Sequence, residues 1–270
     1  MAPPMTPAAF LAALKAEGVT VVEVGSWRTH NRNSKGAWGP VHGVMIHHTV
    51  TSGSARTVEI CRNGYSGLPG PLCHGVITKD GRVHLVGYGR ANHAGLGDDD
   101  VLAAVIAEKK LPAANEANTD GNARFYGFEC ENLGDGKDPW PAAQLDAIER
   151  VSAAICRVHG WDAASVIGHL EWQPGKVDPR GFAMASMRDR IERRLSAPPG
   201  KTPTPTPERE KPMSYKEIWE QDKAPAPSTS PTREKNPTWK PISFLREIYD
   251  LARETRDLVR DIRDQQKKGA

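Results

Sequence analysis

The amino-acid composition changes abruptly after Ala197, and this change limits how much of the chain can form a packed core. Half of the 22 prolines of the 270-residue chain lie in residues 198–241, with runs such as Thr-Pro-Thr-Pro-Thr-Pro. Closely spaced prolines favour an extended, semi-rigid chain. We therefore predict a folded domain over residues 1–197, a Pro-rich linker over residues 198–241 and an amphipathic helix over residues 242–268.

Within the predicted domain, segments with the two-residue period of strands alternate with segments that have the period of helices. The predicted strands cover residues 20–24, 41–50, 74–78, 82–86 and 124–132, and the predicted helices cover residues 10–14, 54–61, 141–159 and 184–195. Lys79-Asp80-Gly81 between two of these strands is typical of a hairpin turn. The alternation predicts an α/β fold with a central mixed β-sheet flanked by helices.

The last predicted helix carries a regular apolar stripe. Its apolar residues follow one another mostly at steps of three and four, with Thr255 in one gap: Leu245, Ile248, Leu251, Leu258 and Ile262. The remaining positions are rich in Arg, Asp and Glu, so the segment resembles nearly three heptads of a coiled coil. Two alternatives stay open: self-association or partner binding through this stripe, and packing on its own domain.

Charge and hydropathy exclude several classes of protein. A formal net charge of +3 does not suit a dedicated nucleic-acid binder. No apolar run approaches the ~18 residues of a membrane span, so we expect none. The N-terminus lacks the pattern of a signal peptide, because residues 1–5 carry no Lys or Arg and Lys15 and Glu17 interrupt the apolar run that follows. We therefore expect synthesis as a soluble cytoplasmic protein.

The four cysteines form no Cys-x-x-Cys pair, which argues against a thiolate zinc site. Cys61 and Cys73 flank a Gly- and Pro-rich loop. They either close this loop as a disulfide in an oxidising compartment or are small buried residues. Cys130 and Cys156 are predicted to lie in the core.

Two kinds of metal ligand occur in segments that suit a catalytic site. His47 and His48 lie on a predicted strand, and His169 and Asp178 lie in a later segment rich in Trp, Pro and Gly. A catalytic zinc ion is held by three protein ligands and keeps a fourth position for water, so two imidazoles and a carboxylate predict one Zn²⁺ per chain. Neighbouring strand residues point to opposite faces, so only one of the paired histidines can enter the cleft. The sequence leaves open which one.

Two charged residues are candidates for the chemistry of amide hydrolysis. Lys176 lies two residues before Asp178, so an extended loop would place its ammonium group near the metal, where it could stabilise an oxyanion. Glu129 lies on a strand in apolar surroundings, where a carboxylate needs a partner such as an activated water. Glu131 shares its face and competes for the role of general base. The alternatives are a solvated Lys-Asp pair and an outward-facing Glu129.

Five motifs occur in a fixed order along the chain. They are Ile46-His47-His48-Thr49, residues 74–81 (His-Gly-Val-Ile-Thr-Lys-Asp-Gly), residues 91–95 (Ala-Asn-His-Ala-Gly), Tyr126-Gly127-Phe128-Glu129, and residues 168–179 with Gly168-His169 and Lys176-Val177-Asp178-Pro179. This order resembles that of type 2 N-acetylmuramoyl-L-alanine amidases, the superfamily of zinc amidases and peptidoglycan-recognition proteins that includes phage endolysins. The resemblance covers about residues 20–197.

The resemblance implies roles for individual residues. Zinc would be held by three ligands, His47, His169 and Asp178, with Glu129 and Lys176 as catalytic groups. His93 would contact substrate in the cleft wall, and His74 would either do the same or be structural. Many relatives have a catalytic Tyr at the position of Cys73, and this departure strengthens the role of Glu129. A Cys73 nucleophile paired with His74 is disfavoured, because adjacent strand residues face apart.

The resemblance also implies a function. The substrate would be bacterial peptidoglycan, and the reaction hydrolysis of the amide between N-acetylmuramic acid and L-alanine, with lysis of the cell wall. The lack of a signal-peptide pattern and the appended linker fit a phage endolysin that accumulates in the host cytoplasm. A virion-associated lysin and a bacterial recycling enzyme are the alternatives, although the long Pro-rich tail suits recycling poorly. Two other classes stay open: a non-catalytic peptidoglycan-binding module and a zinc peptidase that cuts within the stem peptide.

Overall fold

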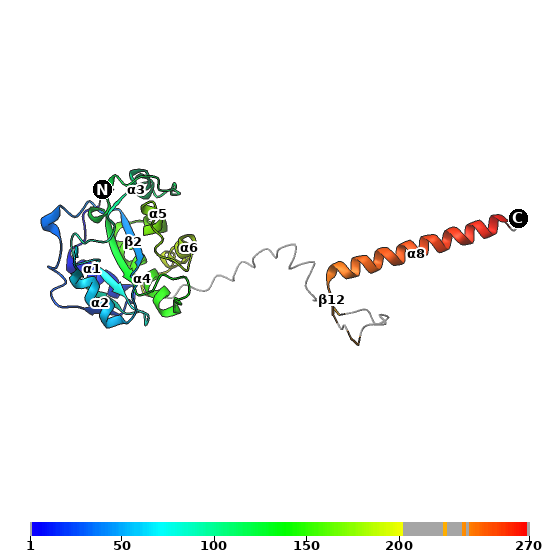
Figure 1. Ribbon diagram of the computed structural model, residues 1–270, viewed down its shortest axis with the longest axis horizontal. Helices are drawn as coiled ribbons and strands as arrows, with labels where there is room; N and C mark the ends of the chain where they lie inside the picture. The colour runs from blue at the N-terminus through cyan, green and yellow to red at the C-terminus, as the bar shows by residue number, and fades with distance from the viewer. Residues whose placement is uncertain (1, 202–223, 226–233, 236–237, 269–270) are drawn as a thin grey trace. The chain divides into compact units, whose positions relative to one another are not determined.

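The computed structural model describes residues 2–201, 224–225, 234–235 and 238–268 (Figure 1). The chain divides into two compact units, Met1–Pro203 and Thr204–Ala270. Most of the predicted linker, residues 198–241, lies outside the described residues, so its extended conformation stays a prediction. The second unit contains the predicted C-terminal helix as α8 (Pro241–Lys268).

A six-stranded sheet forms the centre of the first unit, with the strand order β1-β6-β5-β9-β2-β10. The strands span Val21–Glu23 (β1), Gly43–His48 (β2), Gly75–Ile77 (β5), Val83–Leu85 (β6), Phe125–Cys130 (β9) and Val166–Gly168 (β10). β5 and β6 form an antiparallel hairpin, and all other neighbours in the sheet are parallel. The predicted mixed sheet and its hairpin are therefore confirmed.

Helices cover both faces of this sheet (Figure 1). One face packs against α1 (Pro7–Ala16), α4 (Ala142–His159) and α6 (Met184–Leu195), and the other against α2 (Ser54–Asn63), α3 (Asp99–Ile106) and α5 (His169–Trp172). The Thr6 hydroxyl caps α1 by accepting a hydrogen bond from Ala9 N–H. Gly160 ends α4 in the left-handed conformation that glycine adopts without strain.

The two faces of the sheet have different cores. Ile46 and Phe128 pack with α1, α4 and α6 in the larger core. Met45 directly precedes Ile46, and Phe125 lies three residues before Phe128. Both point to the other face and pack with α3 and Trp172 in a smaller core. This division follows from the two-residue period of a strand. The predicted site residues of β2 and β9 belong to the second face.

Among the α-helices of this unit and the strands of its six-stranded sheet, three elements have no counterpart among the predicted ones: α3, α5 and β10. β10 has three residues and α5 has four, which is too short to show a period in the sequence. α3 starts at a strong cap, because the buried carboxylate of Asp98 accepts hydrogen bonds from the N–H groups of Asp100 and Val101.

The other described strands form three two-stranded sheets: β3 (Gly64–Tyr65) with β4 (Leu68–Pro69), β7 (Leu96–Gly97) with β8 (Thr119–Asp120), and β11 (Ala224–Pro225) with β12 (Thr238–Trp239). All four cysteines are buried free thiols, so the alternative of a Cys61–Cys73 disulfide does not hold in this structure. Within the described ranges, no helix is both long enough and apolar enough to cross a membrane.

Candidate active site

Three adjacent parallel strands bring the candidate residues to one edge of the sheet. β9, β2 and β10 are neighbours, with His47 paired to Glu129 and Ile46 paired to Gly168 in register. Paired residues of neighbouring strands project from the same face, so the side chains of His47 and Glu129 lie side by side. His169 follows β10 directly, at the level of His47. The carboxyl ends of parallel strands are a usual location for a functional site in α/β proteins.

The loop after β10 returns Asp178 to the same edge. The N–H group of Leu170 donates a hydrogen bond of 2.7 Å to the Asp178 carbonyl oxygen. Glu171 accepts two hydrogen bonds from Arg188 of α6, both 2.8 Å long, and a third from Gly168 N–H. These contacts fix both ends of the loop on the domain, so Asp178 is held rather than free to swing.

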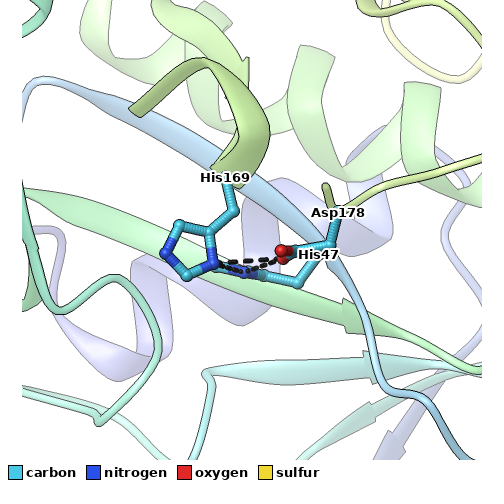
Figure 2. A group of neighbouring side chains, drawn as sticks. All are labelled: His47, His169 and Asp178. Carbon is cyan, nitrogen blue, oxygen red and sulfur yellow. Dashed lines mark hydrogen bonds and ion pairs between the residues drawn. The ribbon is translucent and has the colours of Figure 1, made fainter. Parts of the chain in front are cut away.

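Figure 2 shows three side chains from separate segments that converge on one point. The Nδ1 atoms of His47 and His169 lie 3.1 Å apart, and Oδ2 of Asp178 lies 3.0 Å from the first and 3.1 Å from the second. Ligands of a tetrahedral zinc ion, with bonds of ~2.0–2.1 Å, are separated by ~3.3–3.4 Å. The three donors therefore fit a zinc ion after a shift of a few tenths of an ångström, and they form one of the groups of residues that could hold a metal.

The protonation states also suit a cation. Burial lowers the pKa of His47 to about 4, so its imidazole is neutral at physiological pH. Burial alone would raise the pKa of Asp178, but the hydrogen bonds with His169 and His47 hold it below its ordinary value. A neutral imidazole, as at His47, and an ionised carboxylate are the forms that bind a metal ion.

The structure also separates the two neighbouring histidines. His47 enters the cluster with His169 and Asp178, whereas the Nδ1 atom of His48 accepts a hydrogen bond of 3.0 Å from Arg180 N–H. A Cβ atom on Gly134 would lie 2.2 Å from the His48 ring, so that ring is packed closely against the backbone. His48 thus positions the chain beyond Asp178 and is the histidine that the cluster does not use.

Glu129 has an unusual environment for a carboxylate. Its Oε2 atom is buried and has no hydrogen-bond partner among the residues that the structure describes. Burial, together with repulsion from Asp178, raises the pKa of Glu129 to about 8, although the charge of Lys176 opposes this. A carboxyl group that gains and loses a proton near neutral pH is suited to general acid–base chemistry.

The competing carboxylate, Glu131, is engaged elsewhere. It is 4% exposed and accepts hydrogen bonds from Gly53 N–H (2.8 Å) and the Ser54 hydroxyl (2.6 Å) at the start of α2, and a longer one from Lys79 N–H. These contacts tie α2 to β9. Glu131 therefore has the geometry of a structural group, and Glu129 alone of the pair lines the cleft.

The cluster opens into a cleft of about 610 Å³. Glu129, Lys176 and His93 line it together with the three cluster residues, so the structure brings these candidates together. Lys176 is exposed, and its charge acts on both His47 and Glu129. The cleft rim contains exposed apolar side chains: Val50, Tyr65, Leu68 and Val177.

His93 contacts the cluster through the ring of His47. Its Nδ1 atom lies 3.1 Å from Nε2 of His47, and its own Nε2 atom is buried without a partner in the described part of the chain. Gly127 makes this possible, because a Cβ atom there would lie 2.4 Å from the His93 ring. A histidine that binds a metal through one ring nitrogen is oriented by the group that contacts its other ring nitrogen. His93 is therefore placed to orient His47.

Asn122 is a residue of this site that sequence reasoning missed. Its Oδ1 atom accepts hydrogen bonds from the N–H groups of His93, Ala94 and Gly95, at 2.9, 2.9 and 3.3 Å. These bonds fix the backbone that carries the His93 ring. The only signal in the sequence is an Asn in a short Gly-Asn-Ala segment, which is typical of any turn.

His74 lies outside the cleft lining. It is fully buried, with Gly127 N–H donating to its Nδ1 atom (2.9 Å) and its Nε2–H donating to the Gly89 carbonyl oxygen (2.8 Å). Both ring nitrogens are thus used by the backbone, which matches the structural alternative for His74. Cys73 is also fully buried, and burial raises the pKa of its thiol well above the usual value. Such a thiol is a poor nucleophile.

Replacing His74 by Leu is expected to lower the free energy of unfolding by about 3 kcal/mol, because two buried backbone groups lose their partners at ~1–3 kcal/mol each. Burial lowers the folded-state pKa of His74 from 6.5 to about 4. The unfolded chain therefore binds more protons in this window, and stability falls as the pH drops from 6.5 to 4. The variant should lose part of that pH dependence in urea titrations.

His84→Leu on the neighbouring strand β6 is the matched control for this prediction. The Nε2 atom of His84 is buried but has no partner among the described side chains and backbone. Its removal should therefore cost less than that of His74. Equal losses for the two variants would contradict the structural role of His74.

Comparisons with known proteins give one family match and several similar solved structures. The family model described as N-acetylmuramoyl-L-alanine amidase matches residues 37–181, more than half of the chain. No curated protein matches the chain. Similar solved structures include the endolysin amidase LysCS from Clostridium intestinale, with 17% identity, a TM-score of 0.41, and coverage of 63% of this chain and 94% of that one.

Two further solved structures are similar at the same level. The Staphylococcus aureus hydrolase AmiA has 14% identity, a TM-score of 0.45, and coverage of 72% of this chain and 93% of that one. A variant of Drosophila PGRP-LB has 14% identity, a TM-score of 0.41, and coverage of 63% and 95%. The family match includes all five motifs, and the resemblance predicted from them is confirmed. The chain belongs to the N-acetylmuramoyl-L-alanine amidase family and is an enzyme that hydrolyses an amide bond of peptidoglycan.

Proposed function

We propose that the protein hydrolyses the amide between N-acetylmuramic acid and L-alanine with one zinc ion held by His47, His169 and Asp178. The observation that carries this proposal is the convergence of three donor atoms within 3.1 Å of one another at the floor of an open cleft. The donor set of two nitrogens and one carboxylate oxygen suits zinc and leaves a fourth position for water.

A zinc ion bound there would supply a Lewis acid that acidifies water and polarises a carbonyl group. Glu129 accepts a proton from the attacking water, since its Oε2 atom is buried and unpaired in the described residues. As the C–N bond breaks, Glu129 returns this proton to the alanine nitrogen. The products are the lactyl carboxylate of the glycan and a stem peptide with a free amino end.

Lys176 has a separate task in this scheme. Its exposed side chain lines the same cleft as Glu129 and its charge lowers the pKa of that group. Positive charge beside the reacting carbonyl stabilises the oxyanion that forms when water adds. The cation held by Asp178 would also offset the repulsion that raises the pKa of Glu129, and so favour the ionised form that accepts a proton.

The rim of the cleft suits a polymer that carries sugars and short peptides. Val50 and Tyr65 are 66% and 62% exposed, and both line the cleft beside the cluster. Apolar and aromatic surfaces bind the CH faces of sugars and the methyl groups of lactyl and alanyl units. Val50 has a φ of 52°, which is strained for a β-branched residue and is typical of functional positions.

Identification of the new chain ends tests the proposal. Purified peptidoglycan is digested with the full chain and zinc, and the fragments are analysed by mass spectrometry. Intact stem peptides with a free L-alanine amino group are expected. Other amino termini would show a peptidase that cuts within the stem, and no new ends at all would indicate a binding module.

We also propose a lytic role as an endolysin that is made in the cytoplasm and reaches the wall after the membrane is breached. The amidase family match, which covers residues 37–181, supports action on the bacterial cell wall. Expression in a bacterium should leave the culture intact until the membrane is permeabilised, and lysis should follow at once. Lysis without permeabilisation would contradict this role and leave the amidase chemistry untouched.

A further inference from the structure

The helix α8 repeats the same pattern of residues every seven positions. From Leu245 the sequence reads Leu-Arg-Glu-Ile-Tyr-Asp-Leu, then Ala-Arg-Glu-Thr-Arg-Asp-Leu, then Val-Arg-Asp-Ile-Arg-Asp-Gln. The repeat includes the charged positions as well as the apolar ones. A seven-residue period over the length of a helix is the pattern of a coiled coil.

The apolar residues of α8 form one exposed stripe. Ile248, Leu251, Leu258 and Ile262 are 60%, 55%, 65% and 49% exposed. An isolated helix in water gains little from propensity alone, and helices in proteins are stabilised chiefly by burying such a stripe. The stripe therefore needs a partner surface.

Charge differs between the two sides of this stripe. Glu247 and Glu254 lie seven residues apart on one side, next to Leu251 and Leu258. The residues that flank the other side, Ala252 and Val259, are uncharged. When two such helices run parallel, the acidic side of each faces the uncharged side of the other, whereas an antiparallel pair sets the two acidic sides against each other.

We propose that α8 pairs with α8 of a second copy of this chain, parallel and in register, and so joins two amidase domains in one molecule. The seam would alternate β-branched residues (Ile248, Thr255 and Ile262) with leucines (Leu251 and Leu258), a combination that favours two strands. The Thr255 hydroxyl donates a hydrogen bond of 2.8 Å to the Leu251 carbonyl oxygen. It is satisfied within its own helix and can present its methyl group to the seam.

A membrane surface fits this helix less well than a second copy does. Helices that lie on anionic membranes carry mainly Lys and Arg on their polar face. Here the polar face also carries an acidic residue in each repeat, at Asp250, Asp257 and Asp264. This near balance of acidic and basic residues suits a protein partner with the same alternation of charges.

The mass of the full chain in solution, from light scattering after gel filtration, tests the pairing. A dimer of the 29.5 kDa chain is expected. Leu258→Glu should weaken dimerisation by a factor on the order of 100, because an unpaired carboxylate would enter the apolar seam. Arg260→Glu places the same group on the polar face two residues away and should leave the dimer intact.

Cysteine cross-linking tests the orientation. The four native thiols are buried, so Ile248→Cys and Ile262→Cys each add one accessible thiol. A parallel, in-register pair predicts that each variant forms a disulfide with itself under mild oxidation. Disulfides that form only in a mixture of the two variants would show an antiparallel pair and overturn the proposal.

A monomeric full chain would also overturn the proposal, whether or not the helix binds elsewhere. Binding of the monomer to anionic lipid vesicles, if lost in Leu258→Glu, would assign the stripe to a membrane. A monomeric chain and a membrane-bound helix would both leave the proposed amidase reaction in place, because all of the substitutions lie in α8 and none lines the cleft.

Discussion

Replacing His47 with Ala is expected to abolish hydrolysis of peptidoglycan and to lower the affinity for zinc by more than ~100-fold, since even the loss of an outer hydrogen-bond partner of a ligand costs ~10–100-fold. His47 contributes one of the three converging donor atoms, 3.0 Å from Asp178 and 3.1 Å from His169. Zinc affinity is measured by competition with a chromophoric chelator, and activity by the clearing of purified cell walls.

His48→Ala is the matched control, because it removes the same side chain one residue along β2. His48 contacts Arg180 and not the cluster, so this variant should keep zinc and most of its activity. Treatment of the wild type with a strong chelator should stop wall clearing, and added zinc should restore it. Clearing that survives complete chelation would remove the metal from the proposed mechanism.

The second large effect is expected at Glu129. Glu129→Gln should lower kcat by ~10²–10⁴-fold, the range that general acid–base groups contribute, while the affinity for zinc stays within a few-fold. The amide has nearly the same shape but cannot accept the proton. Burial raises the pKa of Glu129 to about 8, so its charged form is disfavoured in the fold. The variant should therefore be at least as stable as the wild type in urea titrations.

Glu131→Gln separates catalysis from structure in this experiment. Glu131 accepts hydrogen bonds at the start of α2, so its replacement should cost about 1–2 kcal/mol of stability, as for a lost helix cap, and leave kcat nearly unchanged. A Glu129→Gln enzyme with normal kcat, or a Glu131→Gln enzyme that folds normally but has lost its activity, would reverse the assignment of the general base.

The period of apolar residues was sufficient to predict much of the fold. β2, the β5–β6 hairpin, β9 and α4 have clear patterns of strand or helix, and each lies near its predicted position. β10 does not, because its pattern, Val166-Ile167-Gly168, is three residues long. The sequence also cannot give strand order, since the pairing of β2 with both β9 and β10 joins segments far apart in the chain.

The candidate site also depends on contacts between distant segments, which local sequence patterns do not give. Period two shows that His47 and His48 face apart, but the choice between them depends on the register with β9 and on the loop that returns Asp178. The choice of His47 came from the resemblance alone, whereas Glu129 and Lys176 were candidates from the residues as well, and all three roles stay predictions. Asn122 and Glu131 act through hydrogen bonds to backbone groups 27 to 78 residues away, and local patterns contain no information about such partners.

The three donors of the cluster come from widely separated parts of the polypeptide: His47 lies 122 residues before His169 and 131 before Asp178. Contacts of such long range form late, after the intervening chain has been ordered. During translation, Asp178 must emerge from the ribosome before the three side chains can meet. The proposed zinc site therefore forms only when the amidase domain is nearly complete.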